Sequence, residues 1–127
     1  MKVSFDFDST LTVNVVEQFA KRLVKEGHEV WIVTSRHEFA DLSGNKVNNT
    51  ELFELANECG ILKNHIHFTC SKNKSEFLKD KGFLWHLDDD VIELSFIRTD
   101  TDVFPIWRRS GNEWWNQCLD LIRILNK

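Results

Sequence analysis

The sequence predicts an α/β fold in which helices cover both faces of a parallel sheet of about five strands, a Rossmann-like arrangement. Three observations support this expectation. Short segments rich in β-branched and aromatic residues alternate along the chain with longer segments of helical periodicity. The segment Glu29–Thr34 is apolar at nearly every position, which is typical of a strand buried on both faces. The 127 residues contain neither an internal repeat nor a linker, which predicts a single domain over residues 1–127.

The strands are expected where short apolar runs end in polar or chain-reversing residues. The first run alternates around Val3 and Phe5, which is the period of a strand. Pro105 lies in the last run and has no N–H to donate, so that strand is expected at an edge of the sheet. The expected strands cover residues 2–6, 29–34, 65–69, 83–87 and 101–107.

The helices are expected between these strands, and glycines 27, 60 and 82 follow three of them, where helices commonly end. Apolar residues recur with a spacing of three or four in each helix. The polar segment Ser35–Asn49 is expected to be a long loop. The expected helices run from Asn14 to residue 26, from Thr50 to residue 59, and over Val91–Phe96 and Asn112–Asn126. The segment Ser71–Lys81 is expected to be a helix or a turn followed by a helix. The apolar face of the first helix is expected to hold Val15, Val16, Phe19 and Leu23, and that of the last helix Trp115, Cys118, Leu119, Ile122 and Leu125.

Composition limits the classes of protein to which this chain can belong. The net charge is −4, which argues against a general nucleic-acid binder or a basic membrane-surface protein, although a local basic patch remains open. No run approaches the ~20 apolar residues that a membrane-spanning helix needs, so no membrane association is expected. Cys59, Cys70 and Cys118 are odd in number and widely spaced. They therefore predict reduced thiols and a cytoplasmic protein.

Residues whose side chains can take part in catalysis or metal binding follow the expected strands at their carboxyl ends, which in a parallel sheet lie at one edge. This coincidence of separate segments is the strongest functional signal in the sequence. The residues are Asp6 and Asp8 after the first strand, Thr34 and Arg36 after the second, Asp88 and Asp89 after the fourth, and Lys72 and Lys74 in the segment before it.

This combination fits a metal-assisted phosphoryl transfer. Two carboxylates as close as Asp6 and Asp8 repel each other unless a cation lies nearby or one keeps a proton. Mg²⁺ is held by oxygen ligands from a few carboxylates, and Asp88 is placed to add one. Asp6 can act as the nucleophile and Asp8 as the general acid and base. Thr34 and a lysine can hold the phosphoryl oxygens.

The segment Asp6-Phe7-Asp8-Ser9-Thr10, with Thr34-Ser35-Arg36, Lys74 and Asp88-Asp89 after it, resembles the four-motif pattern of the haloacid dehalogenase superfamily of phosphohydrolases over about residues 2–95. The resemblance implies that Asp6 is the nucleophile and a Mg²⁺ ligand. It implies that Asp8 is the acid and base and gives its backbone carbonyl to the metal. Thr34 and Lys74 would bind phosphate, Asp88 would complete the metal site, and Asp89 would contact the metal through water or support its direct ligands.

Two assignments stay open within this resemblance. Lys72 competes with Lys74 for the lysine role, although Lys74 is preferred because it opens the helical pattern. The acidic run 88–90 leaves the register of the last motif uncertain by one residue, and one of its members is expected to cap the next helix.

The resemblance is closest to members without a cap domain. The first helix begins within a few residues of Thr10, and Ile61–Ser71 is too short for a cap insertion. Thr34-Ser35-Arg36 and the acidic pair are similar to the 3′-phosphatase domain of polynucleotide kinase. The implied substrate is a phosphate monoester, such as a nucleotide, a nucleic-acid end or a phosphoprotein. Ser35, Arg36 and Thr10 would contact it, with Ser35–Asn49 as a partial lid.

Other interpretations of the same residues stay open at this point. Asp6, Asp8, Thr10 and Glu17 have the spacing of a calcium loop, but Leu11 stands where glycine is required. A receiver domain shares the fold, Mg²⁺ and a phosphorylated aspartate, yet its acceptor follows the third strand, where this chain has Thr69-Cys70. A catalytically silent binding module is a third interpretation. Base stacking by tryptophans and arginines is a fourth, and its residues are Trp107, Trp114, Trp115, Arg108 and Arg109.

Overall fold

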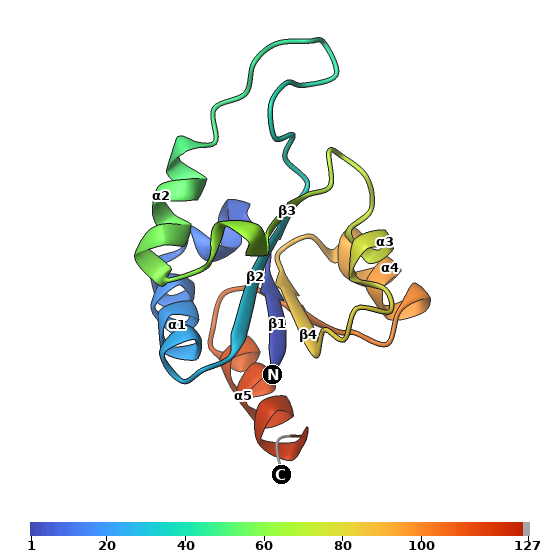
Figure 1. Ribbon diagram of the computed structural model, residues 1–127. Coiled ribbons are helices and arrows are strands. Elements are labelled where there is room, and N and C mark those ends of the chain that lie inside the picture. The colour runs from blue at the N-terminus through green and yellow to red at the C-terminus, as the bar shows by residue number, and fades with distance from the viewer. Residues whose placement is uncertain (126–127) are drawn as a thin grey trace.

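The computed structural model describes residues 1–125 and contains one sheet whose neighbouring strands all run parallel (Figure 1). Its strands are β1 (Lys2–Phe5), β2 (Glu29–Thr34), β3 (Ile66–Phe68), β4 (Trp85–Asp88) and β5 (Phe104–Trp107). Their order across the sheet is β3-β2-β1-β4-β5. The chain therefore winds outward from β1 on one side, crosses back, and winds outward on the other. The predicted α/β class is confirmed, and β5 with Pro105 is an edge strand as expected.

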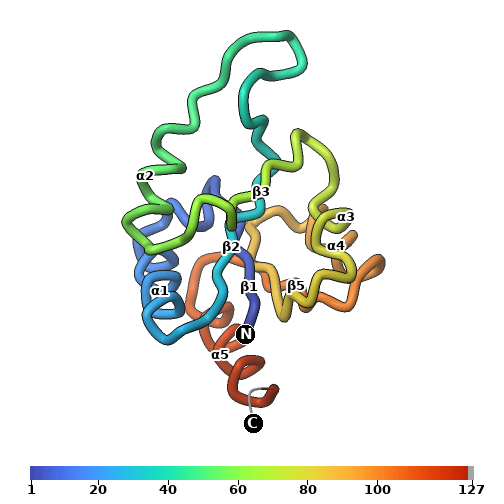
Figure 2. The backbone as a smooth tube through the Cα atoms, viewed as in Figure 1, coloured from blue at the N-terminus to red at the C-terminus, as the bar shows by residue number. Residues whose placement is uncertain are grey.

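Helices cover both faces of this sheet, as Figures 1 and 2 show. Three helices, α1 (Asn14–Lys25), α2 (Thr50–Cys59) and α5 (Glu113–Leu125), pack on one face. The shorter α3 (Lys74–Leu78) and α4 (Val91–Asp100) pack on the other. Among the helices of residues 1–125, none has the length and apolar character needed to cross a membrane.

The larger part of the core lies between the sheet and α1, α2 and α5. Phe5, Phe19 and Trp85 are fully buried there, and the ring centroids of Phe5 and Trp85 are 5.3 Å apart. The opposite face is less apolar. Val33 and Leu78 are buried on it, but Ser4 and His86 face the same side, because successive strand residues point to opposite faces. The sheet thus carries buried polar groups on the face covered by α3 and α4.

Two connections shape the carboxyl end of the sheet. After β1, the short turn η1 (Phe7–Leu11) leads directly to α1. After β2, the loop 35–49 projects beyond the sheet before α2 begins, as predicted (Figure 1). A bridge between Ala40 and Lys46 and a turn around Asp41 give the projecting part of this loop a local fold.

The segment Ser71–Lys81 was expected to be a helix or a turn followed by a helix, and the second form is the one observed. The helix within it, α3, covers only Lys74–Leu78. Ser71 and Asp80 have φ values of 67° and 58°, in the left-handed region that a right-handed helix excludes. The periodicity of Phe77 and Leu78 therefore marked one turn of helix and not three.

Other boundaries also differ from the expectation. α4 is ten residues long, beyond the one or two turns expected, because Leu94 and Ile97 both pack into the smaller core. The first residues assigned to β5 instead close that helix, where the Thr101 hydroxyl donates to the carbonyl of Ile97 over 2.7 Å. Val15 of α1 and Leu125 of α5 are exposed, while Trp114 and not Trp115 is the buried tryptophan of α5. The predicted end of the last helix at Asn126 lies outside the described residues.

Candidate active site

The turn η1 places Asp6 and Asp8 at the carboxyl end of β1. The N–H of Asp6 still pairs with the sheet, donating to the carbonyl of Leu87 over 2.9 Å. The N–H of Leu11 then donates back to the carbonyl of Asp6 over 3.1 Å, which closes a wide turn. Within it Ser9 has φ of 58°, a left-handed conformation that is uncommon outside glycine and concentrates at functional sites. This wide turn brings Asp8 back to the edge of the sheet that holds Asp6.

Three carboxylates meet at this edge. Asp6, Asp88 and Asp89 each offer an oxygen, and these oxygens lie within 4.8 Å of one another. The hydroxyl of Thr10 is shared between two of them, at 3.2 Å from Oδ2 of Asp6 and 3.4 Å from Oδ1 of Asp89. Thr10 thus ties the end of β1 to the end of β4. This set of hard oxygen donors suits Mg²⁺.

Lys74 neutralises part of this charge. Its Nζ lies 2.7 Å from Oδ1 of Asp6 and 2.6 Å from Oδ2 of Asp88, and only 2% of the residue is exposed. The backbone N–H of Lys74 donates to the carboxylate of Glu93 over 2.8 Å, which fixes the start of α3 beside α4. Lys72 is exposed to solvent. Of the two lysines that the sequence left open, the structure brings Lys74 to the carboxylates.

Sequence reasoning missed a buried hydrogen-bonded chain behind Asp88. Nε2 of His86 lies 2.8 Å from Oδ2 of Asp88, and Nδ1 of His86 lies 2.8 Å from the hydroxyl of Ser4. Complete burial lowers the pKa of His86, against the opposing effect of Asp88, so the ring is neutral. An ionised carboxylate only accepts hydrogen bonds, so Nε2–H donates to Asp88 and Nδ1 accepts from Ser4. The signal in the sequence was the alternation of His86 and Asp88 on one face of a strand.

The buried carboxylates have different protonation behaviour. Burial, followed by the charge of Asp88, raises the pKa of Asp6 to about 8, although Lys74 opposes this shift. Burial alone would raise the pKa of Asp88 as well, but the hydrogen bond from His86 and the ammonium of Lys74 hold it well below its usual range. Asp6 therefore gains most from a further positive charge in the site.

Asp8 is in a different environment from Asp6. Its side chain is 55% exposed, and both of its oxygens accept from Arg36, over 2.9 Å from Nε and 2.6 Å from Nη2. The third guanidinium nitrogen of Arg36, Nη1, donates to Oδ1 of Asn49 over 3.2 Å. The guanidinium also lies over the ring of Phe7. Sequence reasoning named Arg36 but missed its pairing with Asp8 and the contribution of Asn49.

The last acid of the run has a structural contact. Oδ1 of Asp90 accepts from the N–H groups of Ile92 and Glu93, over 2.9 and 3.3 Å, and so caps α4. The N–H of Asp90 in turn donates to Oδ1 of Asp88 over 3.0 Å. The expectation that one member of 88–90 caps the helix is confirmed, and that member is Asp90.

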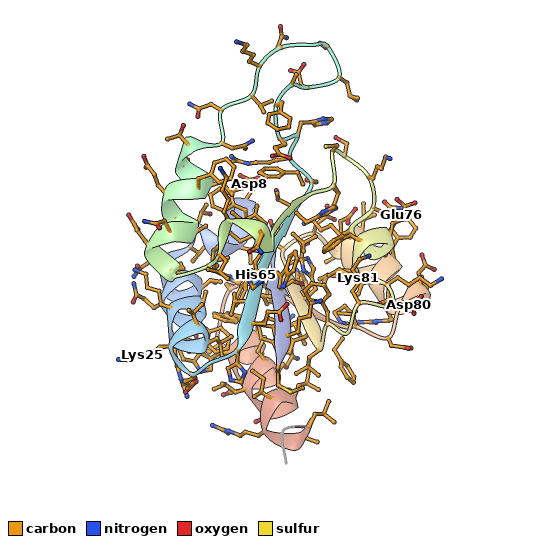
Figure 3. The ribbon with its side chains drawn as sticks, in the orientation of Figure 1. Asp8, Lys25, His65, Glu76, Asp80 and Lys81 are labelled. Atoms are coloured by element: carbon orange, nitrogen blue, oxygen red, sulfur yellow. The ribbon has the colours of Figure 1, made fainter. Side chains whose placement is uncertain are left out.

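These groups surround a cavity of about 350 Å³ at the carboxyl ends of β1 and β4. Six of the nine described residues that line it are acidic, so an unaccompanied phosphate would be repelled. A bound divalent cation would reverse this. Figure 3 shows Asp8 at the end of the sheet from which the long loop projects, while Lys25 lies at the other end. The lining residues are Asp6, Asp8, Ser9, Ser35, Lys74, Asp88, Asp89, Asp90 and Glu93.

The remaining residues named from the sequence are divided between the cavity and its supports. Ser35 lines the cavity. Thr34 is fully buried behind it, and its hydroxyl accepts from the N–H of Arg36 over 3.2 Å. Thr10 is also fully buried and contacts carboxylates. In this structure Thr10 and Thr34 therefore hold other site groups in place.

The aromatic residues considered for base stacking differ in exposure: Trp114 is buried, Trp115 is half-buried and Trp107 is exposed. Trp114 is in the core and Trp115 packs against Phe19, with ring centroids 4.8 Å apart. Trp107 is exposed, and the guanidinium of Arg109 lies over its ring. Trp114 and part of Trp115 are thus used for packing, while Trp107 stays exposed.

Comparison of this chain with protein-family models, curated proteins and solved structures finds no match.

Proposed function

We propose that this protein is a Mg²⁺-dependent phosphatase of the haloacid dehalogenase type, which hydrolyses phosphate monoesters through a phosphorylated Asp6. The single observation that carries the proposal is the cluster of Asp6, Asp88 and Asp89 around Lys74, with Asp8 beside it. Three carboxylates and one ammonium leave a net negative charge in a mostly buried site. Such a site favours a divalent cation, and a nucleophile lies within it.

Each residue would have a distinct part in the reaction. When bound, Mg²⁺ would offset the negative charge and polarise the phosphoryl group. The carboxylate of Asp6 attacks phosphorus, the bond from phosphorus to the ester oxygen breaks, and that oxygen takes a proton from Asp8. Asp8 then accepts a proton from the water that attacks the phosphorylated Asp6. Inorganic phosphate leaves and Asp6 is restored, while Lys74 holds the phosphoryl oxygens.

The fold favours this function over two alternatives that the sequence left open. Receiver domains have the flavodoxin-like strand order 2-1-3-4-5, whereas the order here is 3-2-1-4-5. A calcium loop would need Glu17 as a ligand, but Glu17 pairs with Lys21 on α1, over 3.2 Å. Both differences count against these alternatives.

The candidate substrates follow from the shape of the site. Because η1 leads directly into α1, the cavity at the end of β1 is bordered by the loop 35–49 and not by an inserted domain. This openness suits substrates larger than a free sugar phosphate, such as a nucleotide or the 3′-phosphate end of a nucleic acid. A cytoplasmic location fits such substrates and the three thiols.

Phosphate release from an aryl phosphate tests this function. The wild-type protein with Mg²⁺ should release phosphate, and chelation by EDTA should stop it. Asp6→Asn should lower turnover by several orders of magnitude, as loss of a nucleophile does in other hydrolases. Asp120→Asn, a matched change at an exposed residue of α5, should leave turnover unchanged. Activity that survives in Asp6→Asn would refute the proposed role of Asp6.

A further inference from the structure

The contact between Arg36 and Asp8 engages the carboxylate that is proposed as the general acid and base. Both carboxylate oxygens of Asp8 accept guanidinium N–H groups, at 2.9 and 2.6 Å. Two parallel bonds of this kind form the strongest common pairing of a carboxylate. An acid that serves a leaving group must turn one oxygen toward it. While Arg36 stays in place, both oxygens of Asp8 are engaged, and a leaving group has to compete with the guanidinium for them.

The main chain of Arg36 is held by backbone hydrogen bonds, whereas its guanidinium contacts only other side chains. Its backbone N–H donates to Thr34 over 3.2 Å, and its carbonyl accepts from Cys70 over 3.2 Å, so β2 and β3 hold the main chain. The guanidinium instead contacts three side chains. These are the cavity-lining Asp8 and two buried neighbours, Asn49 and the ring of Phe7. Of these partners only Asp8 is an anion, so a second anion would compete with Asp8 for the guanidinium.

The position of Arg36 differs from that of the cation that serves the reacting phosphate. Lys74 is 2% exposed and lies between Asp6 and Asp88 at the base of the cavity. The side chain of Arg36 is 27% exposed and pairs with Asp8, a cavity-lining carboxylate that is 55% exposed. The phosphoryl group that meets Asp6 would contact Lys74. Arg36 is thus placed to bind an anionic group on the leaving part of the substrate.

We propose that Arg36 is a latch that selects substrates carrying a second phosphate or phosphodiester on the leaving group. The second anion takes the guanidinium, and the exchange uncovers Asp8 for proton transfer to the departing oxygen. A nucleoside bisphosphate and a phosphorylated nucleic-acid end both carry this chemistry. The inference rests on the proposed phosphatase function, because the latch acts on its acid.

Matched substrates test the latch. With Mg²⁺, the wild-type protein should hydrolyse adenosine 3′,5′-bisphosphate with kcat/KM at least about tenfold above that for adenosine 3′-phosphate, the scale of one charged hydrogen bond. A 3′-phosphorylated dinucleotide supplies the same charge as a phosphodiester. If the dinucleotide exceeds the bisphosphate, the natural source is a nucleic-acid end, and the reverse order identifies a free nucleotide.

Variants of Arg36 separate the latch from a general effect on folding. Arg36→Ala should lower kcat/KM for the bisphosphate and raise it for the monophosphate, because Asp8 is no longer covered. Arg36→Lys keeps the charge but not the paired hydrogen bonds, so the preference should persist while the monophosphate reacts faster. Circular dichroism and thermal unfolding should show that both variants are folded.

The results that would refute the latch differ from those that would refute the phosphatase function. Equal kcat/KM on both adenosine phosphates by an active wild-type protein would overturn the latch and leave the phosphatase intact. A preference that survives in Arg36→Ala, or a monophosphate rate that falls in it, would also overturn the latch. Absence of turnover on every phosphate ester would instead remove the proposed function.

Discussion

The two aspartates of the first motif, Asp6 and Asp8, have identical side chains but differ in burial and in their charged partners. Asp6 is 5% exposed and contacts Lys74 and Thr10, whereas the side chain of Asp8 is 55% exposed and pairs with Arg36. Asp6 is therefore a buried carboxylate that shares one ammonium with Asp88, whereas Asp8, two residues later, is a surface carboxylate with a guanidinium of its own. The first suits attack within a metal site, and the second suits exchange of protons with a leaving group or water.

The ammonium of Lys74 is expected to contribute strongly to stability. Lys74→Met removes the partner of two buried carboxylates, and loss of one member of a buried pair typically costs about 3–5 kcal/mol. We expect a decrease of this size in the free energy of unfolding in urea with EDTA present. Mg²⁺ should restore part of it, because the cation takes over the neutralising charge. Lys72→Met, at an exposed site, is the control, and equal stability of both variants would contradict the contact.

Asp6 should also make stability depend on pH. Its pKa is raised to about 8, so the folded protein holds this proton more tightly than the unfolded chain does. The corresponding stability is complete at low pH and is lost as pH rises toward 8. The lowered pKa of His86 acts in the opposite sense, but only below its ordinary value of 6.5.

Between pH 6.5 and 8.5 the metal-free protein should therefore show a falling Tm. Asp6→Asn should flatten this fall, because the amide does not titrate. Mg²⁺ should raise the wild-type Tm more at pH 8.5 than at pH 6.5, since binding favours the ionised carboxylate. A slope that is the same in Asp6→Asn and in the wild-type protein would assign the titration to another group.

At the level of elements, the three consecutive aspartates between β4 and α4 have three different roles. Asp88 ends the strand and is fully buried against His86 and Lys74. Asp89 turns its carboxylate toward Asp6 and Thr10, and Asp90 caps the helix. The strand ends and the helix begins within these residues, so each side chain points in a different direction. A sequence pattern cannot resolve such a junction, because it does not specify at which residue the strand stops.

Substitution at two of these positions should separate metal binding from capping. Asp90→Ala should lower the free energy of unfolding by about 1 kcal/mol, the usual value of an N-cap, and Asp90→Asn should restore most of it. Asp89→Asn should instead weaken Mg²⁺ binding, by about 10–100-fold for an outer ligand. Urea unfolding and a Mg²⁺ titration of phosphate release measure the two effects. Weaker Mg²⁺ binding in Asp90→Asn than in Asp89→Asn would reverse the assignment.

At the scale of the whole molecule, the sequence predicted the α/β class, and the edge position of β5 followed from Pro105. These features depend on local composition and on the absence of one N–H. The sequence also predicted that Asp6, Asp88 and Lys74 would meet, because parallel strands deliver their carboxyl ends to one edge. The geometry of a parallel sheet was enough for this part of the site.

The contacts that the sequence did not predict depend on side-chain direction and on backbone conformation. His86 joins Ser4 to Asp88 across two strands, and this requires the register of β1 and β4. The pairing of Asp8 with Arg36 joins residues 28 positions apart, at the ends of β1 and β2, and depends on the directions of both side chains. Helical periodicity also concealed the φ values that limit α3. Periodicity reports which residues are apolar, but not where the chain reverses.

The most direct measurement of the central claim is the location of the phosphoryl group during turnover. An aryl phosphate has a good leaving group, so in Asp8→Asn the attack by Asp6 should continue while hydrolysis of the phosphorylated enzyme slows. Acid quenching with Mg²⁺ present, followed by peptide mass spectrometry, should find the phosphoryl group on Asp6. The double variant Asp6→Asn with Asp8→Asn should carry none. Turnover by the wild-type protein with no phosphoryl group on Asp6 at any quench time, or with one on another residue, would contradict the mechanism.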